Sequence, residues 1–110
     1  MSDDLRRRYG AALDLLVQKK PEACAVELEK ILAEAPDFLD TYEGLAVVYN
    51  RLGKVDEAIE LMKRLIQKDP DSLMAHVNLS VFYMKKGMKD AAEVEKAKAT
   101  VLQFSRASKK

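Results

Sequence analysis

The chain has 110 residues, of which 48% are hydrophobic and 34% are charged, and its formal net charge at pH 7 is +1. With only three prolines and four glycines, this composition is typical of a folded domain and excludes a long disordered chain. No apolar stretch is long enough to span a bilayer, and no apolar run follows the charged N-terminal residues as it would in a secretory signal. We therefore expect no membrane insertion and a cytoplasmic location. The single cysteine fits a reducing compartment.

Helical spacing of the apolar residues recurs along the whole chain. Pro21 stands where a helix can begin, because a first-turn residue needs no N–H donor. Gly53 and Gly87 fall between helical runs, where a residue with positive φ can end a helix. Asp37 and Asp71, each after a proline, can cap or start the following helix. The predicted helices lie near residues 4–18, 21–34, 38–51, 55–68, 72–86 and 89–106.

A repeat of 34 residues underlies these elements. Tyr49, Gly53 and Ala58 return one period later as Tyr83, Gly87 and Ala92. A period of this length is typical of stacked-repeat architectures, in which about three units give a continuous core. We expect one domain over residues 1–110, with units at about 5–38, 39–72 and 73–106 and a short basic tail at 107–110.

The repeated residue types match a known family pattern of a large residue, Leu, a small residue, Tyr, Gly, Ala, a large apolar residue, Ala and Pro. The middle unit matches best, with Tyr42, Leu45, Ala46, Tyr49, Gly53, Ala58, Met62, Leu65 and Pro70. The third unit departs at Lys96 and Phe104, and the first unit keeps only the spacing and its small or apolar residue types. The chain resembles the tetratricopeptide repeat. The resemblance implies an all-α fold of three tandem helix–turn–helix repeats, stacked into a short right-handed superhelix (α-solenoid).

Residues for catalysis are scarce. His76 is the only histidine and Cys24 the only cysteine, and they occupy different repeat positions two units apart. A histidine-rich metal site and a triad with a second imidazole are therefore excluded. We expect Cys24 to be a small buried filler and His76 to pack between helices. No catalytic residue, metal or cofactor is predicted, and the protein is expected not to be an enzyme.

In proteins of the resembled family, the first helix of each unit lines a concave groove that holds a peptide or helix of a partner. Carried over by position, the groove residues here are Tyr9, Leu13, Leu16, Glu43, Val47, Asn50, Met74, Val77, Asn78, Val81 and Met84. The family's chaperone-tail clamp of Lys, Asn and Arg is absent, because its positions hold Tyr9, Leu13, Gly44, Met74 and Asn78. The resemblance implies an adaptor or small chaperone for a protein or peptide segment with apolar side chains. At the level of the fold, the chain also resembles chaperones of bacterial secretion systems.

A self-assembling scaffold subunit is the alternative function. Its expected surface is a stripe on the last helix formed by Val94, Ala97, Val101 and Phe104, which would associate as a homodimer. Residues 1–84 carry 11 Lys and Arg against 15 Asp and Glu, whereas residues 85–110 carry 8 against 3. No nucleic-acid partner is expected, because no aromatic residues interleave the lysines of this basic end.

Overall fold

The computed structural model describes residues 3–108, and within this range the chain forms six α-helices and no strand. Their bounds are α1 (Asp3–Val17), α2 (Pro21–Glu34), α3 (Asp40–Arg51), α4 (Val55–Lys68), α5 (Leu73–Lys85) and α6 (Lys89–Ser108). The predicted helices are confirmed to within two residues at each end. Of the predicted basic tail, Lys109 and Lys110 lie outside the described residues.

Left-handed residues end the first helix of each pair. Gly53 and Gly87 have φ values of 81° and 77°, as their position in the repeat predicts. Lys19, one period before Gly53, takes the same conformation with a φ of 64°, although its Cβ makes that conformation unfavourable. The turn is therefore a property of the repeat, and the first unit forms it without glycine.

The prediction that Asp37 and Asp71 cap or start helices is wrong. Helix α5 is capped by Ser72, whose hydroxyl oxygen accepts a hydrogen bond from the backbone N–H of Ala75 at 3.2 Å. Helix α3 begins at Asp40 without a side-chain cap. Both aspartates lie in the turns that precede these helices.

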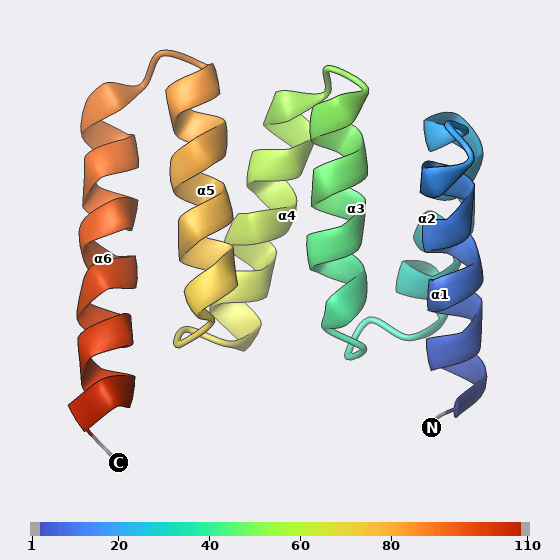
Figure 1. Ribbon diagram of the computed structural model, residues 1–110, viewed down its shortest axis with the longest axis horizontal. Helices are drawn as coiled ribbons and strands as arrows, with labels where there is room; N and C mark the ends of the chain where they lie inside the picture. Colours follow the sequence, from blue (N-terminus) through green and yellow to red (C-terminus); the bar gives the residue numbers. More distant parts are fainter. Residues whose placement is uncertain (1–2, 109–110) are drawn as a thin grey trace.

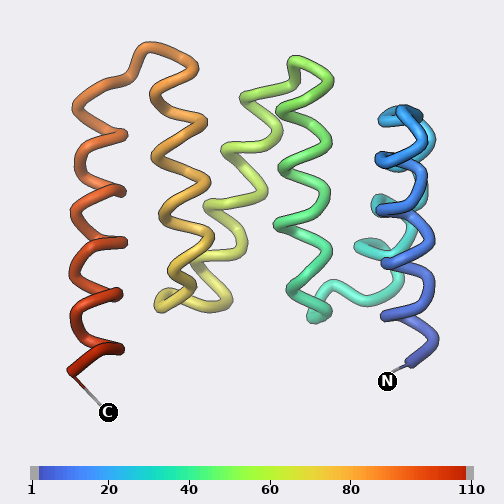
Figure 2. Tube along the Cα trace, viewed as in Figure 1, coloured from blue at the N-terminus to red at the C-terminus, as the bar shows by residue number. Residues whose placement is uncertain are grey.

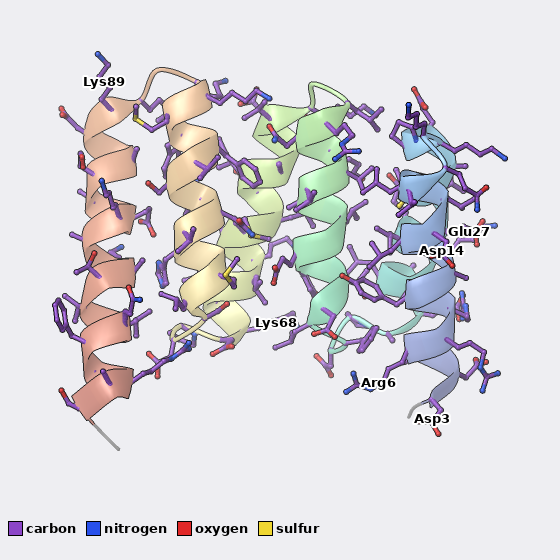
Figure 3. All side chains as sticks on the ribbon, in the orientation of Figure 1. Asp3, Arg6, Asp14, Glu27, Lys68 and Lys89 are labelled. Carbon is purple, nitrogen blue, oxygen red and sulfur yellow. The ribbon has the colours of Figure 1, made fainter. Side chains whose placement is uncertain are left out.

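The six helices form three pairs, α1 with α2, α3 with α4 and α5 with α6. The two helices of a pair run antiparallel, and the pairs stack side by side into a solenoid, as Figures 1 and 2 show. The first helices of the pairs, α1, α3 and α5, lie in one row and contact each other in turn. Figure 3 shows Asp3 and Arg6 on α1 and Lys89 on α6 at opposite ends of this stack. The row of first helices forms one face of the stack.

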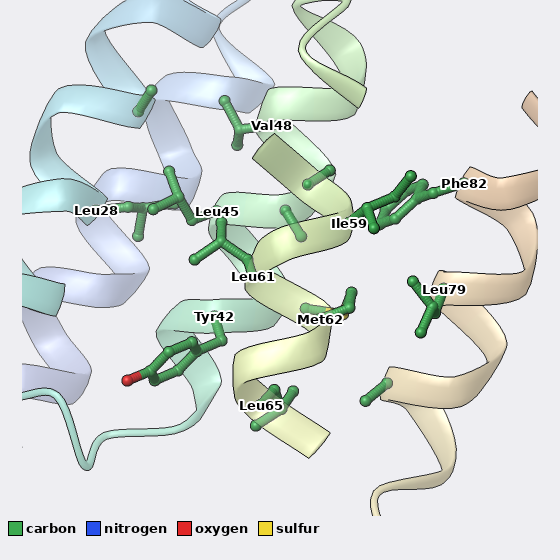
Figure 4. Packing of buried hydrophobic residues seen from close by; sticks show 14 of the residues in the cluster. Leu28, Tyr42, Leu45, Val48, Ile59, Leu61, Met62, Leu65, Leu79 and Phe82 are labelled. Atoms are coloured by element: carbon green, nitrogen blue, oxygen red, sulfur yellow. The ribbon is translucent and has the colours of Figure 1, made fainter. Parts of the chain in front are cut away.

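The core runs through the middle of the stack. Figure 4 shows how Leu45 of α3, Met62 of α4 and Leu79 of α5 pack between neighbouring helices. Ala46 and Ala58 are fully buried, and their small side chains let the helix backbones approach closely. Cys24 is also fully buried, in the repeat position of Ala58, which confirms that it fills space in the core.

Candidate functional site

A groove of ≈ 650 Å³ lies between α5 and α6 at the end of the stack, and we call it the α5–α6 groove. It is lined by Leu73, Met74, Val77, Ser80, Val81, Met84, Ala92, Glu93, Lys96, Ala99, Thr100 and Gln103. The α5 wall is mostly apolar, whereas Glu93, Lys96, Thr100 and Gln103 make the α6 wall polar. Ser80, Ala92 and Ala99 are small, so the backbone of a bound segment can come close to both helices.

The repeat explains why this groove is open. On α4, the equivalent residues Ile59, Met62 and Leu65 are buried in the core that α4 shares with α5. One period later these positions hold Glu93, Lys96 and Ala99, and no described helix follows α6 to cover them. The α5–α6 groove therefore corresponds to the places inside the stack where α3 packs on α1 and α2, and where α5 packs on α3 and α4. Its α6 wall differs because it carries polar residues that can contact water.

The structure brings together four of the predicted groove residues, all on α5: Met74, Val77, Val81 and Met84. Three of them, Met74, Val81 and Met84, are exposed. The predicted groove residues of α1 do not line this groove. Tyr9 is half-buried and stacks edge-on against Phe38, with ring centroids 5.8 Å apart. Leu13 is half-buried, and Leu16 packs on the core.

The predicted groove residues of α3 face a more polar surface. Val47 is exposed, and the Oδ1 atom of Asn50 accepts a hydrogen bond of 3.1 Å from Nζ of Lys85. Burial, and then the charge of Asp40, raises the pKa of Glu43. On α5, the Nδ2 atom of Asn78 is buried and has no hydrogen-bond partner among the described residues. Asn78 is half-buried and is not one of the residues that line the α5–α6 groove.

His76 and Glu95 form a buried polar pair that connects α5 to α6. Nδ1 of His76 lies 2.7 Å from Oε1 of Glu95, and Nε2 lies 3.0 Å from the carbonyl oxygen of Pro70. Because that carbonyl can only accept, Nε2 must carry a hydrogen, and the contact with Glu95 then needs a second proton. Tyr42, one period earlier, donates to the carbonyl of Pro36 at 2.7 Å. The role predicted for His76, packing between helices, is confirmed by its burial and these contacts.

The predicted self-association stripe lies on the side of α6 away from the core. Val94, Ala97 and Val101 border a second groove of ≈ 660 Å³ on the outer side of the stack, together with Ile66 and Pro70. This is not where a following helix would pack, because that place is the α5–α6 groove.

The other candidate chemical groups are isolated. Burial raises the pKa of the Cys24 thiol, which makes it a poor nucleophile at neutral pH. Helices α2 and α5, which carry Cys24 and His76, do not contact each other. Within residues 3–108, no group of three or more His, Cys, Asp or Glu could hold a metal ion. None of the helices in that range combines the length and apolar character needed to cross a membrane.

Comparisons with known proteins agree with the repeat. A family model for the tetratricopeptide repeat matches residues 6–76 and 52–100. An uncharacterized protein, y4yS of Sinorhizobium fredii, is 31% identical over 86 residues, which are 72% of this chain and 47% of that protein. The chain thus spans about half the length of this relative.

Two solved structures share the fold. The crystal structure of MamA superposes with a TM-score of 0.89 at 24% identity and covers 94% of this chain, which spans 61% of MamA. The type III secretion translocator chaperone SycD of Yersinia enterocolitica has a TM-score of 0.88 at 20% identity, with 93% of this chain and 76% of SycD covered. At these identities the likeness shows the fold.

Proposed function

The chain belongs to the tetratricopeptide repeat family, and from this premise we propose that it is a non-enzymatic protein–protein interaction module whose α5–α6 groove binds an amphipathic helix of a partner. One observation carries the proposal. The groove is the place where the repeat would pack a following helix, and its apolar α5 wall is exposed. At the two internal junctions, α3 and α5 fill the corresponding places.

The walls of the groove define the chemistry of the partner. The α5 wall, with Met74, Val81 and Met84, takes apolar side chains that recur at helical spacing. The two methionines are flexible and polarizable, so they can adapt to side chains of different shape. The opposite wall holds Glu93 and Lys96, which favour a polar or charged edge on the bound helix. The partner is thus a helix with an apolar stripe flanked by polar residues.

An adaptor or small chaperone is the role that this groove supports. SycD, which shares the fold, is a translocator chaperone. The apolar groove would shield the apolar face of a partner helix from water. A bound segment would be held through this face and not through a terminal carboxylate, since Met74 and Asn78 stand at positions of the family's cationic clamp.

The test selects partners from a displayed library of helical peptides against the immobilised protein. We expect the enriched peptides to carry apolar residues at i, i+3 or i+4, and i+7. Their affinity, measured by fluorescence anisotropy, should fall at least tenfold for the Val81→Glu/Met84→Glu variant, because each substitution buries a charge against the apolar stripe. Val17→Glu on α1 is the matched control, since Val17 is an exposed valine far from the groove.

Val47→Glu distinguishes this groove from a longer one along the row of first helices. Val47 is exposed one period before Val81 but does not line the α5–α6 groove. Unchanged binding by Val47→Glu, with loss in the α5 variant, supports the proposal. Equal loss in both would move the site to the row formed by α1, α3 and α5. Selected peptides that bind the α5 variant as tightly as the wild type would refute the proposed function.

A further inference from the structure

Helix α6 carries an apolar stripe on its solvent side that no described part of the chain covers. Val94, Ala97, Val101 and Phe104 follow the 3-4-3 spacing of a heptad seam. Val94, Val101 and Phe104 are 53%, 67% and 70% exposed. Ala92, Glu95 and Ala99 are buried and hold the opposite side of α6 against α5. As α6 is the edge of the stack (Figure 1), its solvent side is open to another molecule.

The repeat shows that the fold does not require an apolar stripe here. One period earlier, α4 has Glu60, Lys63 and Gln67 at the positions of Val94, Ala97 and Val101, and all three are exposed. The same surface is thus polar on the preceding second helix. Exposed apolar side chains at three such positions, two of them valines, followed by a phenylalanine, indicate an interaction surface.

We propose that α6 pairs in parallel with α6 of a second copy of this chain, in a two-stranded coiled-coil contact about a twofold axis. Val94 and Val101 occupy the a positions of the heptads, and Ala97 and Phe104 occupy the d positions. In parallel coiled coils, β-branched residues at a positions favour two strands over three or four. The contact is isologous and therefore closed, so it gives a dimer and not a filament.

Charge complementarity determines the direction of the pairing. Glu93 is at a g position and Lys98 at the next e position of the same heptad frame. In a parallel pair, each g residue faces the e residue of the following heptad in the other helix. The dimer therefore joins Glu93 of each copy to Lys98 of the other, twice by symmetry. An antiparallel pair would set g against g and e against e, and would lose both attractions.

Lys98 is free to make this contact. Its Nζ lies 3.2 Å from Oε2 of Glu95 in its own chain, yet its side chain remains 55% exposed. An ammonium group has three hydrogen-bond donors, so it can serve both carboxylates. The proposed interface shares only Glu93 with the α5–α6 groove, because Val94, Ala97, Lys98, Val101 and Phe104 do not line that groove.

Sedimentation equilibrium of the full chain tests the dimer. We expect a concentration-dependent dimer for the wild type and a monomer for Val101→Glu/Phe104→Glu, with an unchanged helical circular dichroism signal because both residues are exposed. Val17→Glu is the control for an exposed valine on another helix, and it should dimerise like the wild type. A wild type that is monomeric at its highest soluble concentration, or a dimer that persists in the double variant, overturns the proposal.

Reversing the charge of Glu93 or of Lys98 tests whether the two α6 helices run parallel. Glu93→Lys and Lys98→Glu should each raise the dimer dissociation constant about tenfold, since each replaces two attractions by two repulsions. An equimolar mixture of the two variants restores both opposite-charge contacts, so it should form a heterodimer with near wild-type affinity. If the mixture dimerises no better than either variant alone, the parallel register is refuted.

Disulfide trapping gives an independent measure of orientation. Cys24→Ala provides a cysteine-free background, in which Val94→Cys and Val101→Cys are tested separately with oxygen and a copper catalyst. In a parallel pair, both a positions meet their own copies, so each variant should be trapped as a covalent dimer. Lys96→Cys, on the groove side of α6, is the control and should not form a covalent dimer. Trapping at only one of the two sites would show an antiparallel pair and refute the proposal.

Discussion

Gly10 and Gly44 occupy the same position of the repeat but have different surroundings. A Cβ on Gly10 would meet no atom within 4 Å, whereas a Cβ on Gly44 would lie 2.6 Å from the hydroxyl oxygen of Tyr9. Further atoms of the Tyr9 ring lie 3.0 and 3.2 Å from that position. Gly44 is therefore needed where the Tyr9 ring crosses from α1 to α3.

Alanine substitutions should separate these two sites. Gly10→Ala should raise the free energy of unfolding by about 1 kcal/mol, because alanine is the better helix former. Gly44→Ala should lower it by about 1–3 kcal/mol, because the new methyl group must displace a half-buried ring. Chemical denaturation followed by circular dichroism measures both. Adding Tyr9→Leu to Gly44→Ala should recover part of the loss, and no recovery would place the strain elsewhere.

Tyr9 and Tyr49 should lose their hydroxyl protons at a higher pH than an ordinary tyrosine. Burial, with the carboxylates of Asp40 and Glu43, raises the pKa of Tyr9 to about 12. Burial and the 2.5 Å hydrogen bond to Glu29 raise the pKa of Tyr49 to about 12. The ordinary value is 10.0. Because the folded state holds these protons more tightly, their contribution to stability is full below about pH 10 and is lost as pH rises toward about 12.

The measurement is a tyrosinate absorbance titration of the folded protein. Tyr9→Phe and Tyr49→Phe should each remove one of the late-ionising groups and leave the remaining curve unchanged. The stability of each variant should also depend less steeply on pH in this alkaline range. If all tyrosines of the wild type ionised near the ordinary pKa of 10.0 while the helical signal stayed intact, the packing of both rings would be contradicted.

The junction between α5 and α6 contains a buried polar pair of side chains that the middle unit lacks. His76 and Glu95 stand one period after Tyr42 and Leu61, both of which are buried. The pair thus replaces a phenol and an aliphatic side chain by two ionisable groups within the core. Removal of one member leaves the other buried without its partner.

A double-mutant cycle with residues of the middle unit tests this pair. Glu95→Leu alone should lower the free energy of unfolding by roughly 3–5 kcal/mol, because His76 loses its buried acceptor. His76→Tyr/Glu95→Leu copies the residues of the middle unit and should unfold at or above the wild-type denaturant concentration, since the replacement of a buried polar pair by well-packed residues of similar volume is often neutral or stabilising. If the single and double variants are equally unstable, the coupling between the two side chains is absent.

At the scale of the whole molecule, stability comes from contacts between neighbouring pairs of helices. The buried cluster runs from Ala12 on α1 to Phe82 on α5 without a break. Each pair of helices shares its apolar residues with the next, so no pair can lose its packing without exposing the side chains of its neighbour. The solenoid should consequently unfold as one cooperative unit.

Leu45→Ala tests this in the middle of the stack. Leu45 is only 1% exposed, so the truncation should cost about 2–5 kcal/mol. Thermal melts by circular dichroism should shift to a lower temperature as a single transition. Val17→Ala, at an exposed position on α1, should change the free energy of unfolding by less than about 0.5 kcal/mol. Two separated transitions for Leu45→Ala would show that the pairs of helices fold independently.

The order of the helices and their turns follows from the sequence alone. Apolar spacing defines each helix, and the repeat places Leu45 and Ala58 at core positions, where the structure has them. Tyr49, a repeated tyrosine that the same pattern predicts in the core, is only half-buried. Gly53 and Gly87 identify two turns because only a residue without Cβ takes positive φ at no steric cost. These features are local or repeat with the period, so a single sequence is enough to predict them. The family follows from the same residues.

Only the tertiary structure decided where the surfaces lie. Tyr9 occupies a groove position in the repeat, but its ring lies between α1 and α3, because Gly44 has no side chain to fill that space. Glu95 stands at a buried position of α6, and its contact with His76 depends on how α6 packs on α5. The sequence offered one signal for this pair, a glutamate in the repeat position of buried Leu61. Which side of a terminal helix meets the core, and which stays open, is determined by the packing of the stack and not by the helical period.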